Sequence, residues 1–177
     1  MIRFIEAIPI TLFLAYIRRI DTQVPENFKG PFTISAAAAV LLICILVYKK
    51  QPLNRLFLGI NLYLISGGAA FITHQYWLNR IYDDLQASGM LLWIIGVGVV
   101  TTLLSPRGFI NTASSDKKRV KTKSLFLLLF ASIAFAVAFL FRTNKLFPEF
   151  VPFVCLFLLQ NHTEDKLNKT GNWNGKA

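Results

Sequence analysis

The stretch that most constrains the fold comprises residues 124–141, which read SLFLLLFASIAFAVAFLF and carry no charged side chain. A helix of this length covers most of the hydrocarbon core of a bilayer, which needs about 20 predominantly apolar residues. Four further apolar runs of similar character occupy residues 32–48, 56–73, 88–104 and 146–160. Because a helix pairs its backbone polar groups within one segment, the pattern predicts an all-α, polytopic integral membrane protein.

Composition supports a membrane protein over a soluble one. The chain is 54% hydrophobic and 16% charged, whereas average soluble domains are roughly 25% charged. The net charge of +10 would suggest nucleic acid for a soluble chain, but here the basic residues cluster between apolar runs. We therefore expect the lipid bilayer, and no nucleic acid, as a partner. Cys44 and Cys155 lie inside apolar runs without a CxxC pair, so no disulfide framework or cysteine metal site is predicted.

The first apolar run, residues 2–17, allows two interpretations. It is short for a span, is interrupted by Glu6, and ends in two arginines where a cleaved signal peptide would have small residues. It either lies at the membrane interface or crosses as a short, tilted span. We therefore expect five to six transmembrane helices in a single membrane-embedded domain over residues 1–160. The polar tail, residues 161–177, is expected to be disordered and cytoplasmic.

The basic stretch from Arg107 to Lys123 determines the expected threading. If all six runs cross, thirteen of the 19 Lys and Arg residues fall on the side of this stretch and six on the other. The richer side should be cytoplasmic, together with both termini, and the segment His74–Gln86 should lie outside. Six basic residues are expected to anchor the topology and contact anionic lipid: Arg107, Lys117, Lys118, Arg119, Lys121 and Lys123.

Four polar residues in or beside apolar runs are candidates for a role within the membrane: Glu6, Asn61, His74 and Glu149. Intramembrane charges are costly and often mark ion or proton paths. Both acids also lie near the ends of short runs, where contact with the interface is the plainer interpretation. A lone His at a membrane edge is usually neither a pH sensor nor a ligand. The two acids in one cavity would indicate transport, whereas acids on opposite sides would indicate anchoring.

No catalytic motif is present: the sequence has no P-loop, GxGxxG, HExxH or Ser/His/Asp order. Asp83 and Asp84 are adjacent acids of the kind that hold Mg²⁺ with a phosphate substrate, but their neighbourhood is poor in further acids. A membrane enzyme acting on lipid-linked phosphate is thus the weakest of the alternatives. We predict no catalytic residue, no cofactor and no metal site.

Two stretches carry a family resemblance. Residues 1–21, MIRFIEAIPITLFLAYIRRID, place a Phe, an acid and a Pro in an apolar run that ends in basic residues and Asp. Residues 66–74, SGGAAFITH, place a Gly pair before apolar residues and a His. In these features the chain resembles the bacterial intracellular septation protein A family of small inner-membrane proteins. Its C-terminal half matches only in hydropathy, and the SSDKKRVKTK run departs from the family.

The resemblance implies a multi-pass protein of the bacterial inner membrane with a role in cell-envelope maintenance and cell division. It implies contacts with other envelope or division membrane proteins and supplies no catalytic residues. We therefore expect a non-enzymatic protein that supports envelope maintenance or septation, and a homo-oligomer is compatible with this role. The alternative is a small transporter or channel subunit that uses Glu6, Asn61 and Glu149.

Overall fold

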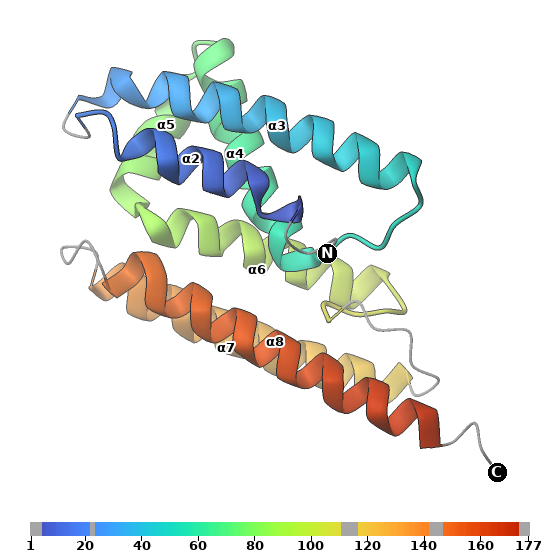
Figure 1. The fold of residues 1–177 in the computed structure, drawn as a ribbon. Coiled ribbons are helices and arrows are strands. Elements are labelled where there is room, and N and C mark those ends of the chain that lie inside the picture. Colours follow the sequence, from blue (N-terminus) through green and yellow to red (C-terminus); the bar gives the residue numbers. More distant parts are fainter. Residues whose placement is uncertain (1–4, 22–23, 111–116, 142–146, 174–177) are drawn as a thin grey trace.

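Helices make up the secondary structure of the computed structural model, and its described residues form no strand. It describes residues 5–21, 24–110, 117–141 and 147–173, except for the side chains of residues 25, 147–150 and 167–173. In chain order the elements are α2 (Ile8–Ile17), the 3-10 helix η1 (Pro25–Phe28), α3 (Lys29–Tyr48), α4 (Arg55–Ile72), α5 (Tyr76–Leu85), α6 (Ala87–Leu104), α7 (Lys117–Leu140) and α8 (Phe147–Trp173) (Figure 1). The predicted all-α fold is confirmed.

Four of the described helical segments are long and apolar enough to cross a membrane. They are Glu26–Tyr48, Arg55–Ile72, Ala87–Leu104 and Lys117–Leu140. They contain the predicted runs 32–48 and 88–104 in full, and the predicted runs 56–73 and 124–141 except for the last residue of each. Each has an 18-residue apolar window with at most two charged residues. Such a helix can lie in hydrocarbon because its backbone groups are paired internally.

The two remaining predicted runs are also helical. Residues 8–17 form α2, whose ten residues fall short of the about 20 that a straight span needs. This helix lies alongside α3 (Figure 1). The rings of Phe13 and Phe32 meet edge-on between the two helices, with their centroids 4.8 Å apart. Of the run 146–160, the described residues 147–160 form the first half of α8, a helix that accommodates Pro152 in its interior.

The prediction of a disordered tail over residues 161–177 is wrong for most of its length. Helix α8 continues to Trp173, so the polar residues after the apolar run extend the same helix. Two of them, Thr163 and Glu164, are buried. The Thr163 hydroxyl donates to the carbonyl of Leu159, and Glu164 accepts from Gln160. Internal partners of this kind let polar side chains stay in a packed helix.

Both described parts of the basic stretch, residues 107–110 and 117–123, contribute to the packed bundle. Helix α7 begins at Lys117, so the Lys and Arg residues from position 117 onward line its first two turns. Before them, Phe109 and Ile110 are fully buried in the core. Gly108, at φ +55°, leaves no room for a side chain against Ser124 of α7. The segment after α6 is therefore packed against α7 rather than solvated, up to Ile110.

Helix α4 is the centre of the bundle. Within its apolar window 67% of positions are buried, against 28–39% in the other three candidate spans. A side chain at Gly67 would clash with the ring of Phe32, and a Cβ at Gly68 would lie 2.5 Å from Cβ of Ala36. The Gly67-Gly68 pair therefore lets α4 approach α3 closely, as small residues do between membrane helices.

The segment after α4 forms the short amphipathic helix α5. Its Tyr82 is buried, and the phenolic oxygen lies 2.6 Å from Oγ of Ser66 and accepts a hydrogen bond of 2.7 Å from Nε1 of Trp93. These bonds fasten α5 to α4 and α6. Asp83 and Asp84 lie on the exposed face of the same helix.

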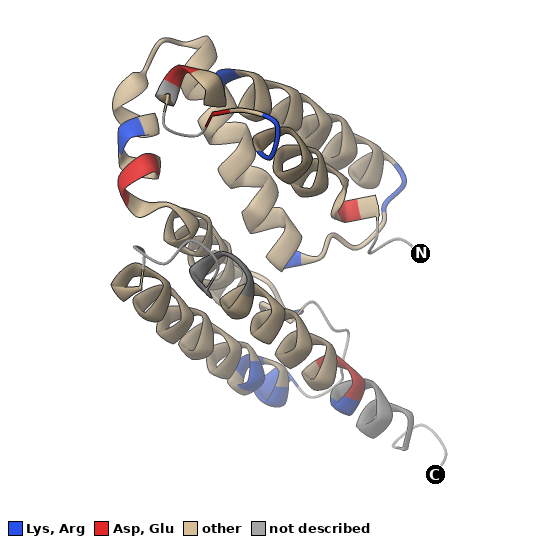
Figure 2. Cartoon of the chain, turned by 60° about the vertical axis from the view of Figure 1, so that its left-hand side comes forward, with Lys and Arg blue, Asp and Glu red and all other residues tan. Residues whose placement is uncertain are grey.

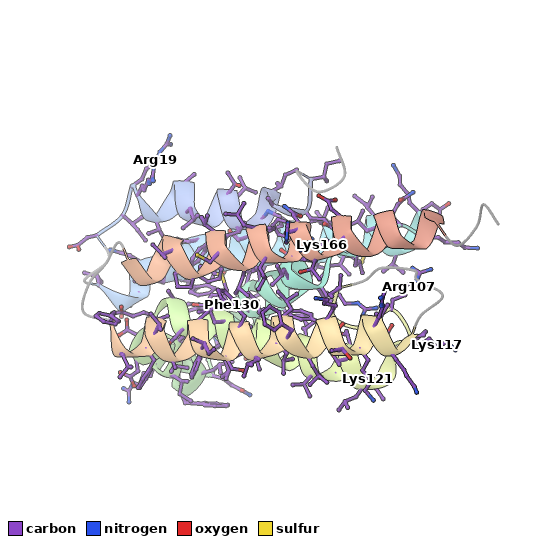
Figure 3. The ribbon with its side chains drawn as sticks, turned by 90° about the horizontal axis from the view of Figure 1, so that it is seen from below. Arg19, Arg107, Lys117, Lys121, Phe130 and Lys166 are labelled. Atoms are coloured by element: carbon purple, nitrogen blue, oxygen red, sulfur yellow. The ribbon has the colours of Figure 1, made fainter. Side chains whose placement is uncertain are left out.

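Charge is distributed unequally between the two ends of the bundle. We call the end where α3 and α6 finish and α4 and α7 begin the basic end. Among the described residues it carries Lys49, Lys50, Arg55, Arg107, Lys117, Lys118, Arg119, Lys121, Lys123 and Lys166, against the acids Glu6, Glu164 and Asp165 (Figure 2). The opposite end carries Arg18, Arg19, Lys29 and Arg80 against Asp21, Glu26, Asp83 and Asp84. Figure 3 shows Arg19 at one end and Arg107, Lys117 and Lys121 at the other.

Candidate functional site

A group of buried polar side chains lies at the basic end, where the turn between α3 and α4 meets the N-terminal segment. Asn54 ends this turn in an extended conformation and caps α4, because its side-chain oxygen accepts from the N–H of Leu56 at 2.9 Å. The backbone N–H of Asn54 in turn donates to Oε1 of Glu6 at 2.9 Å. The Glu6 side chain is only 2% exposed, so its carboxylate is part of the protein interior.

Helix α8 joins this group through Gln160, which is 1% exposed. Its Nε2 donates to Oδ1 of Asn54 at 3.3 Å and to Oε1 of Glu164 at 2.9 Å. The bond to Asn54 connects residues 106 positions apart in the sequence. Glu6, Asn54, Gln160 and Glu164 thus form one hydrogen-bonded cluster from three parts of the chain, which we call the amide–carboxylate cluster.

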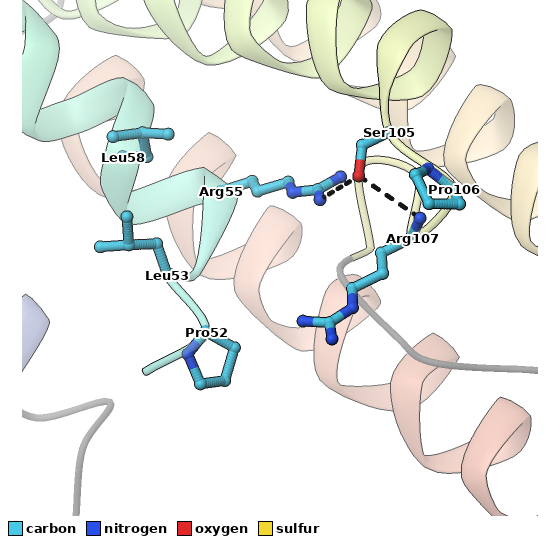
Figure 4. Close-up of a pocket in the computed structure, with 7 residues that line it drawn as sticks. All are labelled: Pro52, Leu53, Arg55, Leu58, Ser105, Pro106 and Arg107. Carbon is cyan, nitrogen blue, oxygen red and sulfur yellow. Dashed lines mark hydrogen bonds between the residues drawn. The ribbon is translucent and has the colours of Figure 1, made fainter. Parts of the chain in front are cut away.

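A cavity of about 400 Å³ adjoins this cluster and is lined by two arginines (Figure 4). Arg55, the first residue of α4, donates from Nη2 to Oγ of Ser105 at 2.7 Å. The backbone N–H of Arg107 approaches the same oxygen at 3.4 Å. Arg55 is buried, whereas the Arg107 side chain is exposed. Figure 4 shows the Arg107 side chain extending away from Ser105, toward the side on which Pro52 lies.

Of the four predicted polar residues, Glu6 alone is seen in this site. Asn61 is buried in α4 at 2% exposure, and its side-chain oxygen has no hydrogen-bond partner within the described part of the chain. Glu149 lies eleven positions before Gln160 on α8, a distance of about 16 Å along a helix, and its side chain is outside the described residues. Glu6 and Glu149 therefore occupy different levels of the bundle.

His74 has a structural role at the other end. It is exposed and follows the last turn of α4 at φ +57°, the left-handed conformation that often ends a helix. The next residue, Gln75, donates from its N–H to the carbonyl of Ala70 at 2.9 Å, which completes this helix-ending motif. The ring Nδ1 of His74 lies 2.7 Å from the Tyr76 hydroxyl. The arrangement is that of a helix cap.

The six basic residues of the topology prediction divide into two kinds. Arg107 lines the cavity, while the other five are exposed on the first turns of α7: Lys117, Lys118, Arg119, Lys121 and Lys123. Val120 and Ser124, on the inner face of the same turns, are buried. The outward face of these turns is thus basic, whereas the inward face belongs to the core.

Sequence reasoning missed five members of the site: Asn54, Arg55, Ser105, Gln160 and Glu164. Asn54 had a usable signal, because an Asn just before an apolar helical run is a common N-terminal cap. Arg55 and Ser105 each stand at the end of an apolar run, where polar residues are ordinary. Gln160 closes the last predicted run and has no local feature that points to Asn54. These contacts are made between segments far apart in sequence, so local patterns do not contain them.

The chain matches no protein-family model, no curated protein and no solved structure. Within the described residues, no group of three or more His, Cys, Asp or Glu side chains is placed to hold a metal ion. The site itself offers a buried amide–carboxylate cluster and, beside it, a cavity with two guanidinium groups and a hydroxyl.

Proposed function

We propose that the chain is a multi-pass protein of the bacterial inner membrane that supports envelope maintenance or septation through contacts with other membrane proteins. The observation that carries a non-transporting, non-enzymatic role is the position of Glu6. Its carboxylate accepts from the backbone of Asn54 and forms part of the joint between three chain segments. A carboxylate used in this way stabilises the fold, whereas a transport acid must exchange partners during a cycle.

The separation of the two intramembrane acids supports the same choice. Glu149 begins α8 at the opposite end from the basic end, far from Glu6. A paired-acid transport path would need both groups along one cavity. The resemblance to the septation family, carried by residues 1–21 and 66–74, adds the envelope context to the proposal.

The proposed orientation places the basic end in the cytoplasm. Among the residues whose side chains are described, ten Lys and Arg against three acids mark that end, and four basic and four acidic residues lie at the opposite end. Under the positive-inside rule this asymmetry is what sets the threading of short loops. The proposed surface for protein contacts is the outer face of α7, where Phe126, Leu129 and Ile133 are all more than half exposed.

Reporter fusions test the orientation. A reporter active only in the cytoplasm, fused after Lys50 or after Trp173, should be active, and one fused after Arg19 should be inactive. Replacing the five basic residues of α7 by Gln should weaken the preference, since each contributes to retention on the cytoplasmic side. A fixed orientation with the basic end outside would refute the proposed threading.

A deletion strain tests the function. Loss of the protein should alter division or sensitivity to envelope stress, and the wild-type gene should restore both. A photo-crosslinking residue at Leu129, which is 59% exposed, should capture a division or envelope membrane protein. The same residue at Leu127, which is 1% exposed, is the matched control and should capture none. Normal division and envelope integrity in the deletion strain would end the proposal.

A further inference from the structure

Arg55 has an unusual environment for a charged side chain. It is 9% exposed, and its Nη1 has no hydrogen-bond partner within the described part of the chain, while Nη2 is bonded to Ser105. A buried charged donor without an acceptor is costly. The positive charge of Arg107 acts on the same group, and like charges repel. The two guanidinium groups of Arg55 and Arg107 therefore make the cavity positively charged, and a negatively charged occupant would stabilise it.

The described residues that line the cavity supply hydrogen-bond donors, and no carboxylate among them competes with an occupant for the two guanidinium groups. None of the described residues that line it is acidic. Ser105 accepts from Arg55 and from the backbone N–H of Arg107, so its own hydroxyl hydrogen can donate to an occupant. Two guanidinium groups and a hydroxyl form the donor set that proteins use for phosphate, because the planar fork of Arg matches two phosphate oxygens.

We propose that the cavity at Arg55, Ser105 and Arg107 binds a phosphate group, and that its source is the headgroup of an anionic phospholipid. The Arg55 guanidinium faces the phosphate from the protein interior, and the exposed Arg107 closes on it from the outer side (Figure 4). The Ser105 hydroxyl accepts from the Arg55 guanidinium and from the backbone N–H of Arg107, and it donates a hydrogen bond of its own to the phosphate.

The position and walls of the cavity favour a lipid over free phosphate. The cavity lies where α4 begins and α6 ends, which is the level of the headgroups for helices that cross a bilayer. Its remaining lining includes the apolar side chains of Pro52, Leu53, Leu58 and Pro106, which suit the glycerol and upper acyl region of a lipid. Basic pockets between membrane helices on the cytoplasmic side commonly hold anionic headgroups.

Binding to the purified full chain in a non-ionic detergent distinguishes the two sources. The probes are short-chain phosphatidylglycerol, phosphatidylcholine with the same acyl chains, and inorganic phosphate, each titrated by calorimetry. Phosphatidylglycerol should bind at least tenfold more tightly than phosphatidylcholine, whose choline cation would meet two guanidinium groups. Inorganic phosphate should bind more weakly than phosphatidylglycerol because it lacks contact with the apolar wall.

Two variants and one control assign the binding to the cavity. Arg107→Gln, at an exposed side chain, should weaken phosphatidylglycerol binding about tenfold or more, the effect of losing one charge-assisted hydrogen bond. Ser105→Ala keeps both charges and should weaken binding several-fold. Lys121→Gln removes one exposed charge from the same end without touching the cavity, so its affinity should equal that of the wild type.

Equal affinities of wild type and Arg107→Gln for phosphatidylglycerol, or equal losses in Arg107→Gln and Lys121→Gln, would overturn the site. Binding of inorganic phosphate as tight as that of phosphatidylglycerol, with the same loss in Arg107→Gln, would keep the phosphate site and overturn the lipid as its source. The inference is independent of the septation role, because these titrations use the isolated protein. A silent deletion strain would refute that role and leave the cavity result standing.

Discussion

Helix α4 approaches α6 closely at Gly59, and Gly59→Ala tests this approach. A Cβ at this position would lie 2.7 Å from Cα and 3.0 Å from the backbone N of Ile94. Backbone atoms cannot rotate away as a flexible side chain can, so the two helices must separate. Ile94 is fully buried in the larger core cluster, together with Leu91 and Phe109, and separation would loosen these contacts.

The expected loss follows from two opposing terms. Overpacking a well-packed core costs about 1–3 kcal/mol. Exchanging Gly for Ala inside a helix returns up to about 1 kcal/mol of helix propensity. The middles of these two ranges, about 2 and about 0.5 kcal/mol, leave a net loss of about 1.5 kcal/mol in the free energy of unfolding. For a chain of this size such a loss lowers the thermal midpoint by roughly 3–6 °C.

The matched control is Gly96→Ala in α6. A Cβ at Gly96 meets nothing within 4 Å, so the same substitution should leave the midpoint unchanged or raise it slightly. Thermal unfolding of both variants in one detergent, followed by circular dichroism, makes the comparison. If Gly59→Ala unfolded at the same temperature as Gly96→Ala, the close approach of α4 to Ile94 would not be a determinant of stability.

Two further substitutions test the buried polar groups. Glu6→Ala should lower the free energy of unfolding by about 1–3 kcal/mol, because the buried N–H of Asn54 loses its acceptor; an unchanged thermal midpoint would contradict the proposed joint. Asn61→Leu should leave stability unchanged or raise it, because a similar-sized apolar side chain replaces a buried amide whose oxygen has no partner within the described part of the chain; a large loss of stability in the same unfolding assay would show that the amide has an essential partner.

The helices of this protein were predictable because their signal is local. The run 124–141 has the length and composition of a span, and no tertiary contact is needed to recognise it. The close contact at Gly67 and Gly68 was also predictable, since small residues mark where membrane helices approach. The boundaries were less so: α7 begins seven residues before the apolar run, because Lys and Arg are good helix formers and continue the helix into the polar region.

Most of the site could not be predicted from local sequence patterns, because its hydrogen bonds join residues that are far apart in the sequence. Gln160 reaches Asn54 over 106 positions, and Arg55 reaches Ser105 over 50. The polar tail was expected to be disordered for the same reason: its residues look solvated until Glu164 is seen to pair with Gln160 inside the bundle. A polar residue at the end of an apolar run looks the same in the sequence whether it meets water or a partner.

The basic residues show why a charge count and a structure answer different questions. For threading, every Lys or Arg near a span end contributes alike, because the positive-inside rule depends on number and side. For binding, Arg55 and Arg107 line the cavity at the basic end, and Arg55 is buried while Lys117 and Lys121 are exposed. A Lys at position 107 would therefore preserve the threading but lose the planar fork that suits a phosphate. Topology and headgroup binding are separable properties of the same end of the bundle.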